Sequence, residues 1–315
     1  MKRNILFRAD SSSKIGTGHI MRDLVLAKQY EEDNITFATQ NFKGNISYKI
    51  KEAKYKIEIL KSNKIKELDL LIKKLQINML VIDSYDIDYK FEKKLKKLNP
   101  KLKILSLDDT YEKHHCDILL NHNISANVKK YKNLVPKECE LRCGAKYTLI
   151  RDEFKKEKKK KLKKNNKKKT IFLAMGGTDH SNINITILKV LKNFTNIKVN
   201  VVTTSANQNL EALKDYIQGK NWIKLHINSN KIAKLMNCSD MAIISPSVIS
   251  HEVLYIGLPF ISIMTGDDQV DMYQFFKDKK LISMKKFDRK KLKKNILKLD
   301  NNLKIYRLKV ERIGK

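Results

Sequence analysis

The feature that most constrains the fold of this chain is an alternation between short apolar runs and amphipathic stretches. The runs have the length of buried strands, and the stretches between them repeat their apolar residues every three or four positions, as helices do. Such alternation predicts a parallel sheet with helices on both faces. In the first half, the expected strands are Asn4–Ala9, Ile35–Thr39, Lys56–Leu60, Met79–Asp83 and Ile104–Leu107. The expected helices are Ile20–Tyr30, Ile65–Leu75 and Tyr89–Leu98.

A Lys-rich segment, residues 155–169, interrupts the alternation, and like charges at this density repel one another. We therefore expect a linker there, between a first domain over 1–154 and a second over 170–315. In the second half, the expected strands are Thr170–Ala174, Val199–Thr203, Ile223–Ile227, Met241–Ser245 and Phe260–Met264. The expected helices are Ile183–Phe194, Leu210–Ile217, Ile232–Met236, Ser250–Ile256 and Met272–Lys279, followed by one or two Lys-rich helices after Asp288. The pattern predicts an α/β protein with two doubly wound domains.

The charge of the chain suggests contact with polyanions. Its 315 residues carry a formal net charge of +32, from 66 Lys and Arg against 34 Asp and Glu. Only eight of the basic residues are Arg, and the lysines are spread over all the expected helices except Ser250–Ile256. A dedicated nucleic-acid surface usually relies on Arg and on exposed aromatic rings. We therefore expect weak, non-specific attraction and no specific nucleic acid. The scarce Arg22 and Arg151 are expected where a planar guanidinium is needed.

Two other classes of protein do not fit the sequence. No apolar run approaches the roughly 20 residues of a membrane-spanning helix. Arg8 and Asp10 follow the apolar residues 5–7 too closely for a signal peptide. We expect a cytoplasmic protein with no membrane partner.

The cysteines allow a metal site but do not require one. They are Cys116, Cys139, Cys143 and Cys238, and two histidines at 114 and 115 lie upstream of the C-x3-C pair. No second paired-cysteine motif accompanies them, so we expect reduced thiols packed as small apolar side chains.

The strongest local motif follows the first expected strand and reads G-T-G-H-I-M-R from Gly16 to Arg22. Gly16 and Gly18 let the backbone approach a ligand, and the amides of a helix N-terminus favour anions. His19 falls in the first helical turn, near Asp10, where a neutral imidazole could act as a general base. We expect the helix N-terminus to hold its pKa down. Alternatively, His19 only bonds the neighbouring loop.

Two further turns lie in the second half. Gly176 and Gly177 follow a strand and precede a hydroxyl and a carboxylate, an order that suits a diphosphate bound by backbone amides. The other turn contains Ser247 and leads to Glu252, which could accept both hydroxyls of a ribose. The alternatives are an ordinary strand–helix turn, and a Ser N-cap followed by a solvated Glu.

These three turns together resemble the GT-B nucleotide-sugar enzymes, which include the transferase that adds N-acetylglucosamine to the peptidoglycan lipid precursor. Further strings are similar to a narrower family on that fold. Its members hydrolyse UDP-2,4-diacetamido-2,4,6-trideoxy-β-L-altropyranose in pseudaminic acid biosynthesis, a pathway associated with flagellin glycosylation. The strings are Phe7–Ser13, Ile15–His19, His114–Asn121, Arg142–Arg151, Met175–Asp179 and Ile232–Asn237. The resemblance runs from about Ile5 to about Lys280.

The resemblance implies two Rossmann-like domains facing across a cleft, with UDP mainly on the second and the deoxysugar facing the first. It implies that water attacks the anomeric carbon and that the bond to the β-phosphate oxygen breaks with inversion. His19 would be the base, Tyr85 would lie near the sugar, and no cofactor is implied. The chain departs from the family at Asp268, where Asn is expected beside Gln269. The expected substrate-binding residues are Asp10, Gly16, Gly18, Arg22, Arg151, Gly176, Gly177, Ser247, Glu252, Asp268 and Gln269.

Two other functions remain open, a GT-B glycosyltransferase with a true acceptor and a polyanion-binding protein. We expect a monomer that needs no metal. The paired carboxylates at 108–109 and 267–268 have no His or Glu partner at a recognisable ligand spacing.

Overall fold

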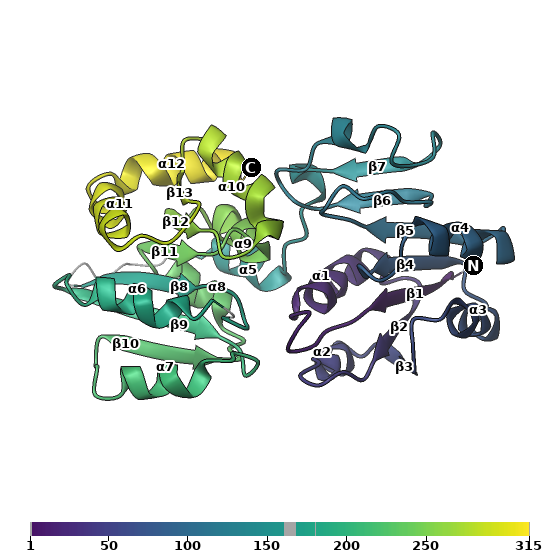
Figure 1. The fold of residues 1–315 in the computed structure, drawn as a ribbon, viewed down its shortest axis with the longest axis horizontal. Helices are drawn as coiled ribbons and strands as arrows, with labels where there is room; N and C mark the ends of the chain where they lie inside the picture. The colour runs from purple at the N-terminus through teal and green to yellow at the C-terminus, as the bar shows by residue number, and fades with distance from the viewer. Residues whose placement is uncertain (1, 161–167, 180, 315) are drawn as a thin grey trace. The chain divides into compact units, whose positions relative to one another are not determined.

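The computed structural model describes residues 2–160, 168–179 and 181–314. The chain divides into two compact units, Met1–Leu149 and Ile150–Lys315, and each is built around its own parallel sheet (Figure 1).

In the described part of the first unit, the sheet has seven parallel strands in the order β3-β2-β1-β4-β5-β6-β7. The strands are β1 (Asn4–Ala9), β2 (Asn34–Gln40), β3 (Lys56–Leu60), β4 (Met79–Asp83), β5 (Lys103–Leu107), β6 (Ile118–Asn121) and β7 (Glu140–Cys143). The strand order reverses between β1 and β4, which is where open α/β sheets bind ligands. The five expected strands are confirmed, and β6 and β7 are additions that the sequence pattern does not predict.

Both faces of this sheet are buried. On β1, Ile5 and Phe7 join one apolar cluster, whereas Leu6 points to the other face and joins a second cluster. Phe7 also stacks on Phe37 of β2, with ring centroids 5.0 Å apart. Successive residues of a strand point to opposite faces, so a strand covered on both sides needs an unbroken apolar run. This burial explains why the pattern located β1 and β4 at their observed bounds.

Helices connect the strands of the first unit. They are α1 (Gly18–Ala27), α2 (Ser47–Glu52), α3 (Ile65–Lys74) and α4 (Tyr89–Leu98), with short 3-10 turns η1 (Lys28–Tyr30), η2 (Val128–Tyr131) and η3 (Ala145–Tyr147). The Asp88 carboxylate caps α4 by accepting a hydrogen bond of 2.9 Å from the Phe91 amide. The three expected helices are present, and α2 is an addition.

In the described part of the second unit, six parallel strands have the order β10-β9-β8-β11-β12-β13. They are β8 (Lys169–Ala174), β9 (Ile197–Thr203), β10 (Ile223–Ile227), β11 (Met241–Ile244), β12 (Phe260–Ile263) and β13 (Ile282–Met284). The five expected strands are confirmed within one or two residues at their ends, and the short β13 is an addition.

The helices of the second unit include one before its first strand. They are α5 (Asp152–Lys158), α6 (Ile183–Leu191), α7 (Leu210–Ile217), α8 (Ile232–Asn237), α9 (Val248–Ile256), η4 (Asp267–Gln269), α10 (Val270–Asp278), α11 (Arg289–Asn301) and α12 (Leu303–Ile313). Helix α5 packs against α8 and α9. The linker expected over 155–169 thus begins inside α5. Residues 161–167 lie outside the described residues, and the linker stays a prediction.

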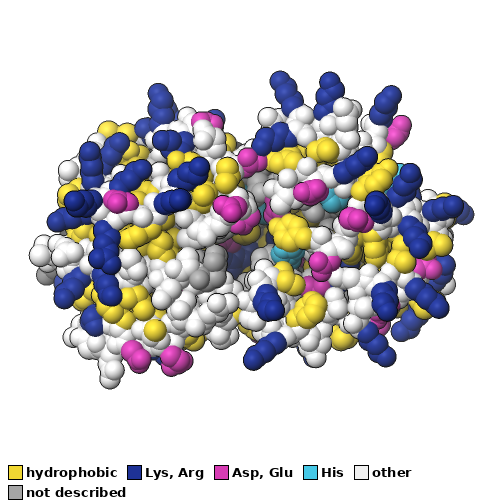
Figure 2. Space-filling view, viewed as in Figure 1, with side chains coloured by type: hydrophobic (Ala, Val, Ile, Leu, Met, Phe, Trp, Pro, Cys, Tyr) yellow, Lys and Arg dark blue, Asp and Glu magenta, His cyan; other side chains and the backbone are white. Residues whose placement is uncertain are grey.

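The surface shows no concentration of basic side chains on the face in Figure 2, where Lys and Arg are scattered among apolar and uncharged groups. No helix in the described ranges is both long and apolar enough to cross a membrane.

Candidate active site

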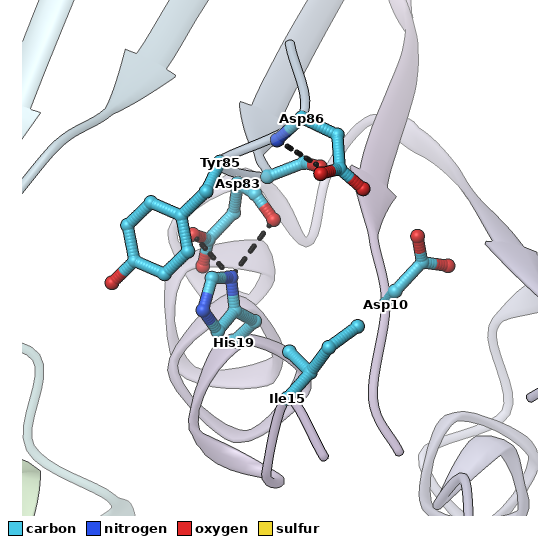
Figure 3. Close-up of a pocket in the computed structure, with 7 residues that line it drawn as sticks. Asp10, Ile15, His19, Asp83, Tyr85 and Asp86 are labelled. Carbon is cyan, nitrogen blue, oxygen red and sulfur yellow. Dashed lines mark hydrogen bonds and ion pairs between the residues drawn. The ribbon is translucent and has the colours of Figure 1, made fainter. Parts of the chain in front are cut away.

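The carboxyl edge of the first sheet carries a cluster of polar side chains. Asp83 is the last residue of β4, Asp10 follows β1, and Asp109 follows β5. A small pocket of about 60 Å³ opens at this edge (Figure 3). It is lined by Asp10, Ile15, His19, Asp83, Ser84, Tyr85 and Asp86.

The glycine-containing loop positions His19. Gly16 has a φ of +87°, in the left-handed region that favours glycine. The Ser12 amide donates to the Gly16 carbonyl at 3.2 Å, and the Gly16 amide donates back to the Ser12 carbonyl at 2.9 Å. The chain then enters α1 at Gly18, so His19 is the second residue of the helix. Gly16 therefore shapes the turn and Gly18 begins the helix, and the contact of both glycines with substrate stays a prediction.

His19 is bonded to Asp83 through one ring nitrogen. Its Nδ1 lies 2.9 Å from the Asp83 Oδ1 and 3.0 Å from the Asp83 carbonyl oxygen. Both neighbours are acceptors, so Nδ1 carries the hydrogen and Nε2 is left with a lone pair. The ring is 7% exposed, and Tyr85 meets it edge to face with centroids 5.0 Å apart. This arrangement suits a general base oriented by a carboxylate.

The pKa of His19 differs from the expectation. Burial lowers the pKa of His19, but the nearby Asp83 carboxylate raises it by more, and the net pKa lies above the ordinary value. The prediction that the helix N-terminus holds this pKa down is therefore wrong. An opposite charge in hydrogen-bond contact outweighs the partial charges of a helix end.

Arg22 contacts two carboxylates. Its Nε lies 2.6 Å from the Asp83 Oδ2, its Nη2 lies 2.5 Å from the Asp83 Oδ1, and its Nη1 lies 2.8 Å from the Asp109 Oδ2. Burial raises the pKa of Asp83, but the Arg22 guanidinium and His19 lower it far below its usual range. The planar fork is therefore used to hold Asp83 ionised. Direct contact of Arg22 with substrate stays a prediction.

Tyr85 lies at the rim of the pocket and is 62% exposed. Its hydroxyl donates a hydrogen bond of 2.9 Å to the Asp109 Oδ1. Desolvation of the hydroxyl and the Asp109 carboxylate raise the pKa of Tyr85 above the ordinary value. The sequence marks Asp109 as one of the paired carboxylates at 108–109 but does not assign it to the site; its contacts with Tyr85 and Arg22 place it there.

Asp10 lines the pocket, and hydrogen bonds from two neighbouring residues hold its carboxylate in place. Its Oδ2 accepts a hydrogen bond of 2.5 Å from the Arg8 guanidinium, and its Oδ1 accepts one of 2.6 Å from the Gln40 amide. Arg8 is fully buried although it belongs to the apolar strand β1. A charged residue inside a buried strand was a signal for this contact that the sequence reasoning did not use.

The glycine turn of the second unit leaves space beside the backbone of Gly176. Gly176 has a φ of +91°, and a Cβ placed there would meet no atom of the described residues within 4 Å. A Cβ on Gly177 would lie 3.0 Å from the Thr204 side chain, whose hydroxyl donates to the Gly177 carbonyl at 2.9 Å. The turn thus has free space beside Gly176 and a tight contact at Gly177. A diphosphate there stays a prediction.

Glu252 lies inside α9 and is 4% exposed, so its interpretation as a solvated helix residue is wrong. Its Oε1 and Oε2 accept hydrogen bonds of 2.7 and 3.0 Å from the Arg151 guanidinium. Burial raises the pKa of Glu252, and Arg151 offsets part of that effect. Ser247 precedes the helix, and its hydroxyl lies 3.1 Å from the Ser245 hydroxyl. Carboxylates have about four acceptor sites, so Glu252 keeps capacity for a ligand.

Asp268, which departs from the family pattern, and Gln269, which matches it, lie in η4. Asp268 is exposed, whereas Gln269 is buried and its Oε1 accepts a hydrogen bond of 2.9 Å from the Thr265 amide. The roles of Asp268 and Gln269 in substrate binding stay predictions. In residues 2–160, 168–179 and 181–314, no three His, Cys, Asp or Glu side chains are grouped so as to hold a metal ion.

Comparison with known proteins decides the family. The chain is 44% identical over 259 residues to a UDP-2,4-diacetamido-2,4,6-trideoxy-β-L-altropyranose hydrolase from Campylobacter jejuni. The match covers 82% of this chain and 90% of that protein. The chain belongs to this family of UDP-sugar hydrolases. A second relative of this chain is an uncharacterized protein of Methanocaldococcus jannaschii. The two are 28% identical, and the match covers 84% of this chain and 56% of that protein. No family model matches the chain.

Similar solved structures show the fold of this chain. MurG of Acinetobacter baumannii aligns with a TM-score of 0.65 at 13% identity, covering 98% of this chain and 95% of that one. The UDP-GlcNAc 2-epimerase of Neisseria meningitidis, solved with UDP-GlcNAc bound, aligns with a TM-score of 0.60 at 11% identity, covering 99% and 94%. The two parallel-sheet units therefore have the GT-B fold, which confirms the expected fold class.

Proposed function

We propose that this protein hydrolyses UDP-2,4-diacetamido-2,4,6-trideoxy-β-L-altropyranose, releases UDP and so takes part in pseudaminic acid biosynthesis. The observation that carries the proposal is the 44% identity to a hydrolase of that name over 82% of the chain. The carboxylate-bound His19 at the pocket supports it, because hydrolysis at a sugar carbon needs a group that can activate water.

In the proposed reaction, the Nε2 of His19 accepts a proton from water as the water oxygen attacks the anomeric carbon. The bond from that carbon to the β-phosphate oxygen breaks, and its electron pair leaves with UDP. The imidazolium that forms is stabilised by Asp83, which Arg22 keeps ionised. A water that His19 activates attacks the anomeric carbon in one displacement, so we expect the anomeric centre to be inverted.

We propose that the pocket of the first unit binds the sugar. Three of its lining residues, Asp10, Asp83 and Asp86, are carboxylates. Carboxylates accept hydrogen bonds from the hydroxyl and acetamido N–H groups of a sugar, whereas they repel a diphosphate. Tyr85 and Ile15 add exposed apolar surface for the methyl groups of the same sugar.

We propose that the second unit binds UDP. The open backbone at Gly176 suits the diphosphate, and the buried pair of Glu252 and Arg151 suits the ribose hydroxyls. Amides and helix N-termini can take the charge of the leaving group, so we expect the reaction to proceed in the presence of a chelator. We also expect the protein to act as a monomer.

A glycosyltransferase is the second candidate. MurG and other glycosyltransferases share the fold of this chain, but at identities that bear on fold alone. The two functions differ in whether an acceptor is needed. The purified protein should release UDP from the diacetamido sugar nucleotide with water as the only acceptor, and a transferase should not.

The variant His19→Ala tests the assignment of the base in the same assay. Loss of a general base lowers turnover by roughly 10²–10⁴-fold. UDP affinity should stay unchanged, because His19 belongs to the first unit. As a matched control, His226→Ala removes a histidine of β10 that bonds Asn200, and it should keep the wild-type rate. A wild-type rate in His19→Ala would contradict the assignment.

A further inference from the structure

Two thiols of the first unit lie close together outside the pocket. The sulfur atoms of Cys116 and Cys139 are 3.7 Å apart, and both residues are free cysteines. Cys116 precedes β6 and Cys139 precedes β7, and these strands are parallel neighbours that pair Ile118 with Glu140. A disulfide needs sulfur atoms about 2.0 Å apart, so a further approach of about 2 Å joins them.

The two thiols have different environments. Cys116 is 4% exposed and packs in the apolar cluster that contains Leu119 and Tyr131, whereas Cys139 is only partly buried. The hydrogen bond between the two thiols lowers the pKa of Cys139, and the same bond together with burial raises the pKa of Cys116. Cys139 is thus the better nucleophile and the one that solvent reaches, and Cys116 keeps its proton.

A metal does not account for this pair. Two histidines precede Cys116 in the sequence. The Nδ1 of His114 is bonded to Glu92 at 2.9 Å, and the ring of His115 meets Tyr89 edge to face. In the described part of the chain, no three ligand side chains converge on one point. The thiols therefore have each other as reaction partners.

We propose that Cys116 and Cys139 form an oxidation site, at which a peroxide converts the two thiols into a disulfide. The Cys139 thiolate attacks one oxygen of hydrogen peroxide, the O–O bond breaks, and Cys139 becomes a sulfenic acid as hydroxide leaves. The Cys116 sulfur then attacks the Cys139 sulfur, the S–O bond breaks, and the Cys116 proton leaves with the hydroxyl as water. The two thiols lose two electrons in all, and the peroxide gains them.

The disulfide ties together the two ends of the segment 117–138. Within this segment, the Tyr131 hydroxyl donates a hydrogen bond of 2.7 Å to the Asp108 Oδ2. The next residue, Asp109, holds Arg22 and Tyr85. Closing such a loop restricts the unfolded chain, so the oxidised first unit should unfold at a higher temperature, by roughly 5 °C or more.

The experiment uses the full chain, reduced and then treated with hydrogen peroxide. Proteolysis without reductant, followed by mass spectrometry, should find one linked pair of peptides containing Cys116 and Cys139. Dithiothreitol should separate the pair and reverse the rise in unfolding temperature. Cys116→Ser and Cys139→Ser should each abolish the link, whereas Cys143→Ser and Cys238→Ser should keep it.

Cys238 is the matched control because it is exposed and belongs to the second unit. Wild-type protein alone can overturn the proposal, even where a variant fails to fold. A link that joins Cys139 to Cys143, or sulfinic acid at Cys139 with no link, would contradict it. Hydrolase activity is not the readout, so failure of the proposed function leaves this test intact.

Discussion

The Nδ1 of His19 lies 2.9 Å from the Oδ1 of Asp83, and the Arg22 guanidinium donates two hydrogen bonds to the same carboxylate. The carboxylate therefore stays ionised while it orients the imidazole and raises its pKa. A base with a raised pKa accepts a proton more readily, but it is active only above that pKa. These two consequences give the relationship a measurable pH signature.

Asp83→Asn should lower the maximal rate and move the pH profile. In the wild type, kcat/KM rises as His19 loses its proton, at a pH above the ordinary value of about 6.5. Without the Asp83 charge the pKa of His19 falls, so the acidic limb should shift to lower pH. The maximal rate should fall by roughly 10-fold or more, because the imidazole loses its orientation. A profile that keeps its acidic limb in place would argue against this pairing.

Tyr85 and Asp109 should behave as a coupled pair. Asp109→Asn weakens the bond that fixes the Tyr85 hydroxyl, and we expect kcat to fall by roughly 10-fold. In a Tyr85→Phe background the same change should cost much less, with a coupling of about 0.5–3 kcal/mol in a double-mutant cycle. Losses that simply add would show that Asp109 acts through Arg22 alone.

Glu252 should contribute to UDP affinity through the ribose. In wild type, replacing UDP with 2′-deoxy-UDP should weaken binding by about 1–3 kcal/mol, the range for a hydrogen bond to a charged group. In Glu252→Gln the two ligands should differ by much less. Calorimetric titration measures both, and a thermal melt checks that the variant is folded after Arg151 loses its charged partner. An unchanged ligand difference would count against the ribose contact.

Asp23 should make stability depend on pH. It is fully buried in α1, and neither carboxylate oxygen has a hydrogen-bond partner among the described residues. Burial and the Asp83 charge raise its pKa well above the ordinary value. The folded state therefore holds a proton that the unfolded chain releases above about pH 4, and stability falls as pH rises from there.

Asp23→Asn removes this proton. The variant should gain stability relative to wild type between pH 5 and pH 8, by at least about 1 kcal/mol. Denaturant unfolding at the two pH values measures this difference. If the difference in stability between the variant and wild type is the same at pH 5 and pH 8, Asp23 is ionised in the folded state.

The sequence predicted strands with a clear apolar run or alternation, from the buried β4 to the partly exposed β3. The four-residue β6 was missed although it is buried throughout. β1 and β4 were found at their observed bounds because both are apolar throughout apart from Arg8 and the terminal Asn4 and Asp83. β7 was missed because Glu140 and Arg142 are polar and the strand is only partly buried at the edge of the sheet. β13 was missed because it spans only Ile282–Met284.

The site was predicted only in part for a related reason. The glycines at 16, 18, 176 and 177 mark turns through local sequence, which a reader of the sequence can see. The partners of His19 and Glu252 come from far along the chain. Asp83 is 64 residues from His19, and Arg151 is 101 residues from Glu252. Which strands lie side by side decides such pairs, and periodicity does not reveal strand order.

Hydrolysis in ¹⁸O-labelled water tests the central claim most directly. Attack by water at the anomeric carbon puts the label on C1 of the released sugar and leaves UDP unlabelled, whereas attack at phosphorus puts it in UDP. Proton NMR of the fresh product reports the anomeric configuration before it equilibrates, and a chelator is present throughout. The account predicts labelled sugar with inverted configuration at an undiminished rate. Label in UDP, retained configuration, or activity abolished by the chelator would contradict it.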